Sequence, residues 1–210
     1  MKILYYTNKD ISDWNVIPNI IYDHSDEVLT YTNKIDLNFL KKENIEFIVS
    51  DRARNLIKRD CIDFLSGRIV NLHPSYLPWN RGYHPNFWSV VEQTPMGVSI
   101  HYIDEQIDTG DIIVQEEIQY DKSSTLKQTY DLSRKMMVKL FANNWTDIRN
   151  QKCKQKRQSK DQGTLHLKND FDGIYELLEN GWDTEIFKVL GNKQITSIVR
   201  AINSSPEREF

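Results

Sequence analysis

The sequence predicts an α/β fold, in which a mostly parallel sheet carries helices on both faces and is followed by a small α+β extension. Short runs rich in Ile, Val and Tyr, the composition of buried strands, alternate with stretches whose apolar residues recur near the helical period. Such alternation favours parallel strands joined by covering helices. The pattern holds up to residue 149, after which a polar stretch precedes a shorter, more irregular segment.

Six segments have strand composition, and the carboxyl ends of such strands form the edge at which ligands bind. They are Lys2–Thr7, Glu27–Thr32, Glu46–Ser50, Arg68–His73, Gly97–Ile103 and Asp111–Gln119. Little between Thr7 and Glu27 resembles a complete strand–helix unit.

Helical patterns lie between several of these strands. The segments are Asp36–Asn44, Arg54–Leu65 and Pro85–Val91, the last with proline at a first-turn position. The strongest pattern covers Ser124–Arg149, where Ser123 or Ser124 can cap the first turn. We expect this long helix to pack across the sheet.

The last part of the chain is predicted to be a small appended unit. Residues 1–150 are expected to form the catalytic domain, and residues 151–210 a linker with a carboxyl-terminal extension. The segment Asn150–Gly163 has no apolar periodicity and reads as a linker whose charges are solvated. The extension is expected to contain a short strand at Gly163–Leu167, helical segments at Ile174–Asn180 and Thr184–Val189, and a frayed end at Ser204–Phe210.

Composition excludes several classes of protein. The chain has 27 Lys and Arg against 30 Asp and Glu, a net charge of −3, so no global charge attracts nucleic acid or an anionic membrane. No segment has the length of a membrane span or the pattern of an export signal. Cys61 and Cys153 lie far apart, in no metal-ligand spacing. We therefore expect a soluble, cytoplasmic protein without a metal.

The densest cluster of unusual residues runs from Asn71 to Gly82, directly after a predicted buried strand. Because strand side chains alternate, Asn71 and His73 project to the same face while Leu72 turns away. The prolines at positions 74 and 78 enforce a rigid loop after them. These two polar side chains can therefore converge on one ligand.

A second polar cluster, Asp104–Asp111, follows the strand predicted at Gly97–Ile103. If that strand runs parallel to its neighbour, Asp108 comes near His73. Singly, an Asn at a strand end, a lone His and an Asp before Thr-Gly are usually structural. Together at one crevice they indicate a functional site.

Four motifs in and between these clusters resemble the folate-dependent formyltransferase family. They are NLHPSYLPWNRG, PNFWS, GVSIHYID and IDTGDII, and the resemblance is strong over roughly residues 46–120. The family includes glycinamide ribonucleotide transformylase, methionyl-tRNA formyltransferase and the nucleotide-sugar N-formyltransferases. The resemblance implies a Rossmann-like sheet, 10-formyltetrahydrofolate as formyl donor, and an active site at Asn71, His73 and Asp108.

The chemistry of formyl transfer suits these three side chains. Attack of an amine on a formyl carbon creates an oxyanion and an ammonium, which require hydrogen-bond donors and a proton acceptor. Asn71 can donate to the oxyanion, and His73 titrates near neutrality. Asp108 would fix the His tautomer and stabilise its charged form.

The resemblance also implies where the folate binds. Family members hold the pterin with the segment ahead of the Asn-x-His strand and with the loop that leads to the catalytic Asp. The corresponding residues are Asn55, Leu56, Ile57, Ile103, Asp104, Gln106 and Ile107. Ordinary helix packing is an equal alternative for Leu56 and Ile57, and His101 is expected to be structural.

The acceptor expected from the resemblance is a nucleotide-linked amino deoxysugar, of the dTDP-4-amino-4,6-dideoxyglucose type, as used in O-antigen and lipopolysaccharide synthesis. The first predicted strand is followed by Thr7-Asn8-Lys9-Asp10 and not by a glycine-rich phosphate turn. A diphosphate needs cations and a base needs an aromatic plane. Arg81 is the leading contact, with Tyr83, Trp79, Asn80 and Lys9 as weaker ones, although a surface-loop role is as plausible for each. Trp88 is expected in the core.

Two alternatives stay open. One is a phosphoribosylglycinamide formyltransferase of purine synthesis, and the other is a catalytically silent relative that binds folate or a nucleotide. The family resemblance suggests a homodimer, with no nucleic-acid or membrane partner.

Overall fold

The computed structural model describes residues 1–8, 15–159 and 162–204, and these form two compact units built from interleaved segments. Unit 1 contains Met1–His73, Ser99–Gln115 and Met136–Gln158. Unit 2 contains the described parts of Pro74–Val98, Glu116–Lys135 and Ser159–Phe210. Division of the chain into a catalytic part that ends at residue 150 and an extension stays a prediction.

The six predicted strands are all present, and they form one mixed sheet in the order β2-β1-β3-β4-β6-β7. Their bounds are β1 (Lys2–Tyr6), β2 (Glu27–Tyr31), β3 (Phe47–Asp51), β4 (Ile69–His73), β6 (Gly97–Tyr102) and β7 (Ile112–Glu117). Strands β1 to β4 pair in parallel, which confirms the predicted α/β class. Strand β6 runs antiparallel to β4, so the expected parallel arrangement of these two strands is wrong.

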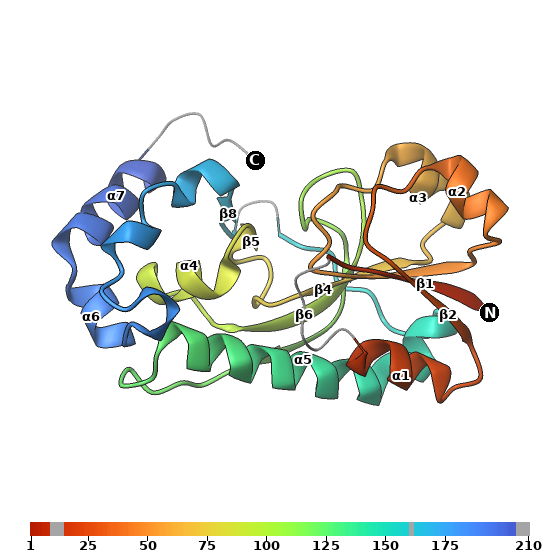
Figure 1. The fold of residues 1–210 in the computed structure, drawn as a ribbon, viewed down its shortest axis with the longest axis horizontal. Coiled ribbons are helices and arrows are strands. Elements are labelled where there is room, and N and C mark those ends of the chain that lie inside the picture. Colours follow the sequence, from red (N-terminus) through yellow and green to blue (C-terminus); the bar gives the residue numbers. More distant parts are fainter. Residues whose placement is uncertain (9–14, 160–161, 205–210) are drawn as a thin grey trace. The chain divides into compact units, whose positions relative to one another are not determined.

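Helices cover both faces of this sheet (Figure 1). On one face, α2 (Leu37–Lys42) and α3 (Arg59–Leu65) pack against strand residues that include Leu4, Ile48 and Ile69. The other face carries α1 (Val16–Tyr22) and the last part of α5 (Leu126–Arg149), where the Phe47 and Trp145 rings meet edge-on at 5.5 Å. The predicted long helix is therefore confirmed.

One helix start in unit 1 was predicted wrongly. Helix α3 begins at Arg59 and not at Arg54, because the chain is still extended at its N-cap, Lys58. The segment between Thr7 and Glu27, in which little resembled a strand–helix unit, contains α1. Ile17 and Ile21, four residues apart and both buried, fix that short helix to the sheet.

Unit 2 holds the loop that follows β4 and the carboxyl-terminal segment. The predicted helix at Pro85–Val91 is confirmed as α4, and a two-residue strand pair joins β5 (Arg81–Gly82) in parallel to β8 (Leu165–His166), which lies within the predicted Gly163–Leu167 segment. Short 3-10 helices follow at Lys168–Phe171 (η1), Tyr175–Leu177 (η2) and Gly181–Asp183 (η3). Helices α6 (Ile186–Gly191) and α7 (Lys193–Asn203) end the described chain, and α7 was not predicted. The end expected to fray lies, after Ser204, outside the described residues.

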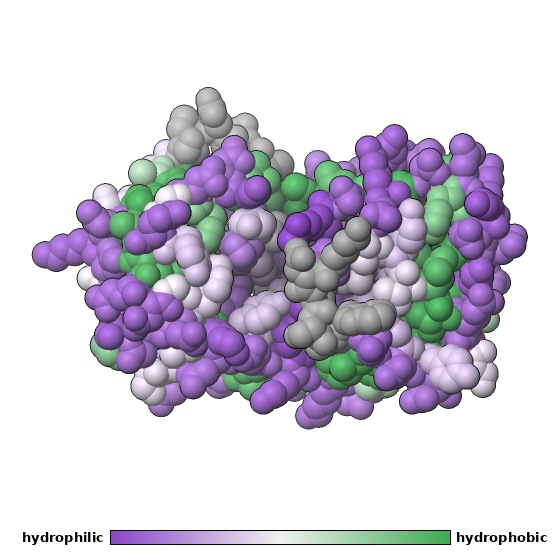
Figure 2. Space-filling model, viewed as in Figure 1, coloured by the Kyte–Doolittle hydropathy of each residue, from purple (hydrophilic) through white to green (hydrophobic). Residues whose placement is uncertain are grey.

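The surface is mostly polar on the face shown in Figure 2. The described residues on the face shown in Figure 2 are largely hydrophilic, with scattered apolar patches. Across residues 1–8, 15–159 and 162–204, no helix is both long and apolar enough to cross a membrane.

Candidate active site

Asn71 and His73 lie on β4, at the carboxyl edge of the parallel part of the sheet. Alternation places both on the face that Ile69 shares with Cys61 and Leu65 of α3, whereas Leu72 packs on the opposite face. The His73 side chain is only 5% exposed, so its ring is held almost entirely within the protein. The strand therefore fixes the two polar side chains side by side.

Asp108 reaches these residues from the loop between β6 and β7. The loop folds back on itself: the Tyr102 amide donates to the carbonyl of Asp111 at 3.0 Å, and Asp108 has a left-handed φ of 54°. Gly110 permits this path because a Cβ atom there would lie 1.9 Å from the Tyr102 carbonyl oxygen. Because the loop folds back in this way, Asp108 reaches the side chains of β4 although β6 runs antiparallel to β4.

Gln158 fixes this loop through hydrogen bonds to its backbone. Its Nε2 atom donates to the carbonyls of both Asp108 and Gly110, at 2.8 Å each, and its side chain is buried. The sequence predicted a solvated linker here, and for Gln158 that prediction is wrong. A buried amide that satisfies two loop carbonyls fixes the backbone that carries the Asp108 carboxylate.

The three predicted side chains meet around the Asp108 carboxylate. Asn71 Nδ2 donates to Asp108 Oδ1 at 3.0 Å, and His73 Nδ1 lies 3.4 Å from Asp108 Oδ2. Each carboxylate oxygen therefore faces a different side chain of β4. Asp108 can orient the amide and the imidazole together.

His101 is a fourth member that the sequence did not assign to the site. It lies opposite Asn71 in the antiparallel pair of β4 and β6 and is 1% exposed. Its Nδ1 lies 2.7 Å from the Tyr102 carbonyl, to which it can donate. Its Nε2 lies 3.2 Å from Asn71 Nδ2 and 3.3 Å from Asp108 Oδ1.

The amide of Asn71 is therefore held from two sides. Its two Nδ2 hydrogens face Asp108 Oδ1 and His101 Nε2, which fixes the orientation of the side chain. To donate to an oxyanion, Asn71 must exchange one of these partners for the substrate oxygen. Hydrogen bonds of this kind often tighten or rearrange when the substrate is bound.

A pocket of about 510 Å³ lies on the α3 side of unit 1. It is lined by Arg59, Ile62, Asp63, Ile103, Asp104, Glu105 and Gln106. Three of the seven predicted folate contacts, Ile103, Asp104 and Gln106, are therefore among its walls. An Arg59–Glu105 ion pair joins the helix wall to the loop wall.

The other predicted folate contacts do not line this pocket. Asn55 and Leu56 are exposed on the loop before α3, and Leu56 is 72% exposed, so helix packing is not its role. Ile57 is partly buried against the core, and Ile107 lies in the loop before Asp108.

The predicted acceptor contacts that the structure describes all lie in unit 2. Arg81 is 4% exposed, and its guanidinium Nη2 lies 3.5 Å from the Ser159 carbonyl. Asn80 is fully buried: Nδ2 donates to Thr94 Oγ1 at 2.8 Å, and Oδ1 accepts from Thr164 Oγ1 at 3.1 Å. Its contacts give Asn80 a structural role. Lys9 lies outside the described residues.

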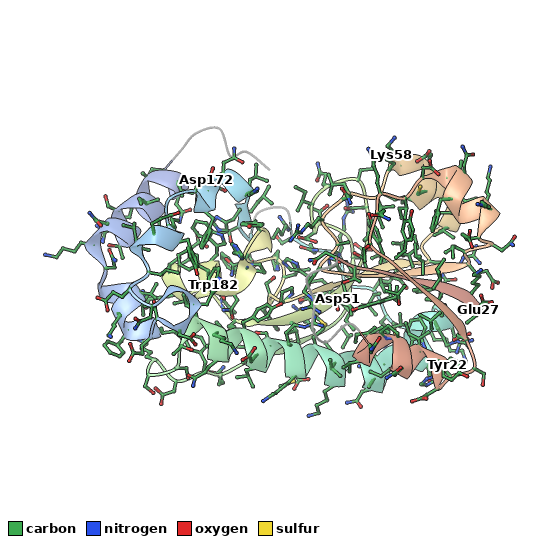
Figure 3. All side chains as sticks on the ribbon, viewed as in Figure 1. Tyr22, Glu27, Asp51, Lys58, Asp172 and Trp182 are labelled. Carbon is green, nitrogen blue, oxygen red and sulfur yellow. The ribbon has the colours of Figure 1, made fainter. Side chains whose placement is uncertain are left out.

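Tyr83 belongs to an aromatic cluster of unit 2. Its ring lies 4.0 Å from that of His84, which in turn contacts Phe171 at 4.4 Å and Trp182, labelled in Figure 3, at 4.9 Å. Tyr83 is 37% exposed, whereas Trp79 is half-buried. Trp88 is fully buried and stacks on His166 at 3.8 Å, which confirms its predicted place in the core. Tyr83 therefore offers part of an aromatic plane.

Metal ligands were also sought among the described side chains. Within residues 1–8, 15–159 and 162–204, no group of three His, Cys, Asp or Glu side chains is arranged to hold a metal ion. The Asn71, His73, His101 and Asp108 cluster instead has the donors and acceptors of a proton-transfer site.

Fold and site define the class of protein. The chain belongs to the formyl transferase family, which matches residues 25–144. It is similar to the dTDP-4-amino-4,6-dideoxyglucose formyltransferase of Mycobacterium tuberculosis, with 32% identity over 139 residues. That match covers 64% of this chain and 56% of the relative, so the chain spans little more than half the length of this relative.

Solved structures extend the comparison over more of the chain. The formyltransferase PseJ from Anoxybacillus kamchatkensis, in complex with UDP-4,6-dideoxy-4-formamido-L-AltNAc and tetrahydrofolate, is 38% identical, with a TM-score of 0.84. The match covers 91% of this chain and 98% of PseJ. A phosphoribosylglycinamide formyltransferase from Bacillus halodurans shares the fold, at 22% identity and a TM-score of 0.57 over 68% of this chain and 92% of that one.

Proposed function

We propose that this protein transfers a formyl group from 10-formyltetrahydrofolate to the amine of a sugar linked to a nucleoside diphosphate. The observation that carries the proposal is the meeting of Asn71, His73 and Asp108 within hydrogen-bond range on a formyl transferase fold. The 38% identity to PseJ, over nearly the whole of both chains, supports a sugar acceptor rather than a ribonucleotide.

The donor folate would bind in the pocket beside α3. Its volume of about 510 Å³ suits a bicyclic pterin, because Ile62 and Ile103 offer apolar faces and the backbone of residues 103–106 offers polar groups for the ring edge. Asp104 is held by its own loop, since Oδ1 accepts from Thr109 Oγ1 at 2.6 Å and from the Gln106 amide at 3.2 Å. Asp104 therefore shapes the pocket wall on which the donor rests.

The reacting groups act in a defined order. With Nδ1–H of His73 directed at Asp108, the other ring nitrogen has the lone pair that accepts a proton from the attacking amine. Asp108 stabilises the imidazolium that results. Asn71 donates to the oxyanion that forms as nitrogen attacks the formyl carbon. The proton held by His73 then passes to the folate nitrogen as the old carbon–nitrogen bond breaks.

The acceptor would be a 4-amino-4,6-dideoxyhexose. The mycobacterial relative is named for dTDP-4-amino-4,6-dideoxyglucose, and the PseJ structure contains UDP-4,6-dideoxy-4-formamido-L-AltNAc, which carries a formyl group on such an amine. A cytoplasmic homodimer completes the proposal.

A panel of acceptors tests this function. The protein would be incubated with 10-formyltetrahydrofolate and, separately, with UDP-4-amino-4,6-dideoxy-L-AltNAc, dTDP-4-amino-4,6-dideoxyglucose, dTDP-3-aminofucose and glycinamide ribonucleotide. Formamide product is measured by mass spectrometry. We expect transfer to a 4-amino sugar nucleotide and none to glycinamide ribonucleotide.

His73→Ala serves as the matched control. It should retain the thermal stability of the wild type and lose transfer by about 10²- to 10⁴-fold. Transfer to glycinamide ribonucleotide alone would replace the proposal with the purine-pathway activity. Folate binding without turnover on any amine would indicate a silent relative.

A further inference from the structure

Asp51 and Arg52 form a charged pair at the same edge of the sheet as the active site, but on its other face. Asp51, labelled in Figure 3, is the last residue of β3. In the sheet register it pairs with Leu72 of β4, the residue before His73. Alternation directs Asp51 to the face of Phe47, which packs on Trp145, whereas Asn71 and His73 point to the α3 face. The Asp51–Arg52 pair and the candidate donor pocket therefore lie on opposite faces of the sheet.

The Asp51 carboxylate holds the Arg52 guanidinium in place. The Asp51 side chain is 0% exposed and accepts from the Tyr5 hydroxyl at 2.7 Å. Its other oxygen lies 3.3 Å from Arg52 Nε, and the Arg52 side chain is 19% exposed. A buried carboxylate costs free energy unless it is paired. The Asp51 carboxylate is paired with Arg52 and is fixed by the Tyr5 hydroxyl.

The backbone adds a second sign of a constrained position. Arg52 has a left-handed φ of 58°, which is uncommon for a residue with a side chain, and its carbonyl accepts from Asn8 Nδ2 at 3.1 Å. Backbone strain of this kind tends to be kept where a side chain must be aimed. The segment after β1 is therefore tied to the segment after β3.

We propose that Arg52 is a specificity-determining residue that binds the diphosphate of the acceptor. This inference rests on the proposed function and extends it to unit 1. Donor and acceptor must approach the formyl carbon from different sides, and the donor pocket lies on the α3 side. The sequence that follows β1, Thr7-Asn8-Lys9-Asp10, is not of the glycine-rich kind that binds phosphate through backbone amides. A guanidinium fixed by Asp51 supplies the positive charge instead, with the fork geometry that phosphate oxygens match.

Calorimetric titrations with three probes test the assignment. The probes are UDP, uridine and inorganic pyrophosphate, titrated into the wild type, Arg52→Ala and Arg52→Lys. We expect Arg52→Ala to weaken UDP and pyrophosphate binding by about tenfold or more, because a charge-assisted hydrogen bond is lost. Uridine binding should stay unchanged, and Arg52→Lys should fall between the two.

The matched control is Arg54→Ala, two residues further along the same loop, where the side chain is exposed. It should bind all three probes like the wild type. In the transfer assay, Arg52→Ala should raise the KM of the acceptor and leave the KM of the folate unchanged. Thermal melts exclude unfolding, and Arg52→Lys still decides the question if the alanine variant is unstable.

Unchanged affinity of Arg52→Ala for UDP and pyrophosphate would overturn the proposal, as would an equal loss for Arg54→Ala or a raised KM for folate alone. Pyrophosphate carries neither base nor sugar. Its response to Arg52→Ala therefore reports on this cation even if the wild type transfers no formyl group to a sugar nucleotide, which is the failure that would contradict the proposed function.

Discussion

Asn71 lies directly opposite His101 in the antiparallel pair of β4 and β6, and the amide nitrogen of Asn71 is 3.2 Å from His101 Nε2. The same amide nitrogen is 3.0 Å from Asp108 Oδ1. The buried His101 ring and the Asp108 carboxylate together orient the Asn71 amide. We therefore expect His101 to be a positioning residue for Asn71, together with the loop that carries Asp108.

Replacing His101 with Phe should lower kcat by about 5- to 150-fold, because Asn71 loses a buried hydrogen-bond partner worth about 1–3 kcal/mol. The KM values of donor and acceptor should change little. His101→Gln, whose side-chain oxygen can accept the same hydrogen, should restore part of the rate. Steady-state kinetics of both variants check this, and a raised KM with normal kcat would contradict it.

Gly110→Ala should disrupt the site without touching a reacting group. A Cβ atom there would lie 1.9 Å from the Tyr102 carbonyl oxygen, so the backbone that positions Asp108 must shift. We expect a loss of turnover of about 100-fold, the cost of misplacing a reacting group by about 1 Å. Gly191→Ala, at a position where nothing lies within 4 Å, is the control and should be active.

Gln158→Ala should loosen the loop that carries Asp108, because Gln158, in the polar segment after α5, is hydrogen-bonded to that loop. Two loop carbonyls lose their shared donor, which should cost about 1–3 kcal/mol of stability. Chemical denaturation measures that change, and hydrogen exchange should show faster opening of residues 103–111. If exchange in this loop is unaffected, Gln158 does not support it.

The Asp26–Arg149 ion pair predicts how stability depends on pH. Burial alone would raise the pKa of Asp26, but hydrogen bonds from Arg149, at 2.6 and 2.7 Å, and from the amino-terminal ammonium lower it below 3.8. Because the folded pKa is depressed, this contribution is fully present above pH 3.8 and is lost as the pH falls through the folded pKa.

Asp26→Asn should therefore lower the free energy of unfolding at neutral pH by about 1–3 kcal/mol. The difference between the variant and the wild type should shrink in acid, below pH 3.8. Urea denaturation at several pH values measures both curves. Parallel curves down to the lowest pH would show that the pair contributes nothing.

Much of the sheet could be predicted because its strands are marked by composition. All six strand segments and the long helix through Trp145 were placed correctly from apolar runs and helical periodicity. Strand direction is not written in composition, so the antiparallel β6 was missed. The segment from Pro74 to Met96 is long enough to let β6 run parallel or antiparallel to β4. The pairing of Asn71 with His101 defines the direction and the register.

The site was predictable where local alternation sufficed. Asn71 and His73 share a face because they are two residues apart, and Asp108 was assigned through its motif. His101 and Gln158 depend on tertiary contacts across 30 and 50 residues, which no local pattern signals. A buried glutamine in a polar stretch looks like any solvated residue until its partners are known. Similarly, α1 is only seven residues long, with Ile17 and Ile21 as its only buried residues.

The central claim is that Asn71, His73 and Asp108 act as one unit on the transferred formyl group. Single-turnover rates of formyl transfer, measured for the three alanine variants and for the triple variant at saturating donor and acceptor, test it most directly. Residues that act as a unit have strongly non-additive effects. We expect the triple variant to be no slower than the slowest single variant. Losses that multiply, or a His73→Ala variant with the wild-type rate, would contradict the account.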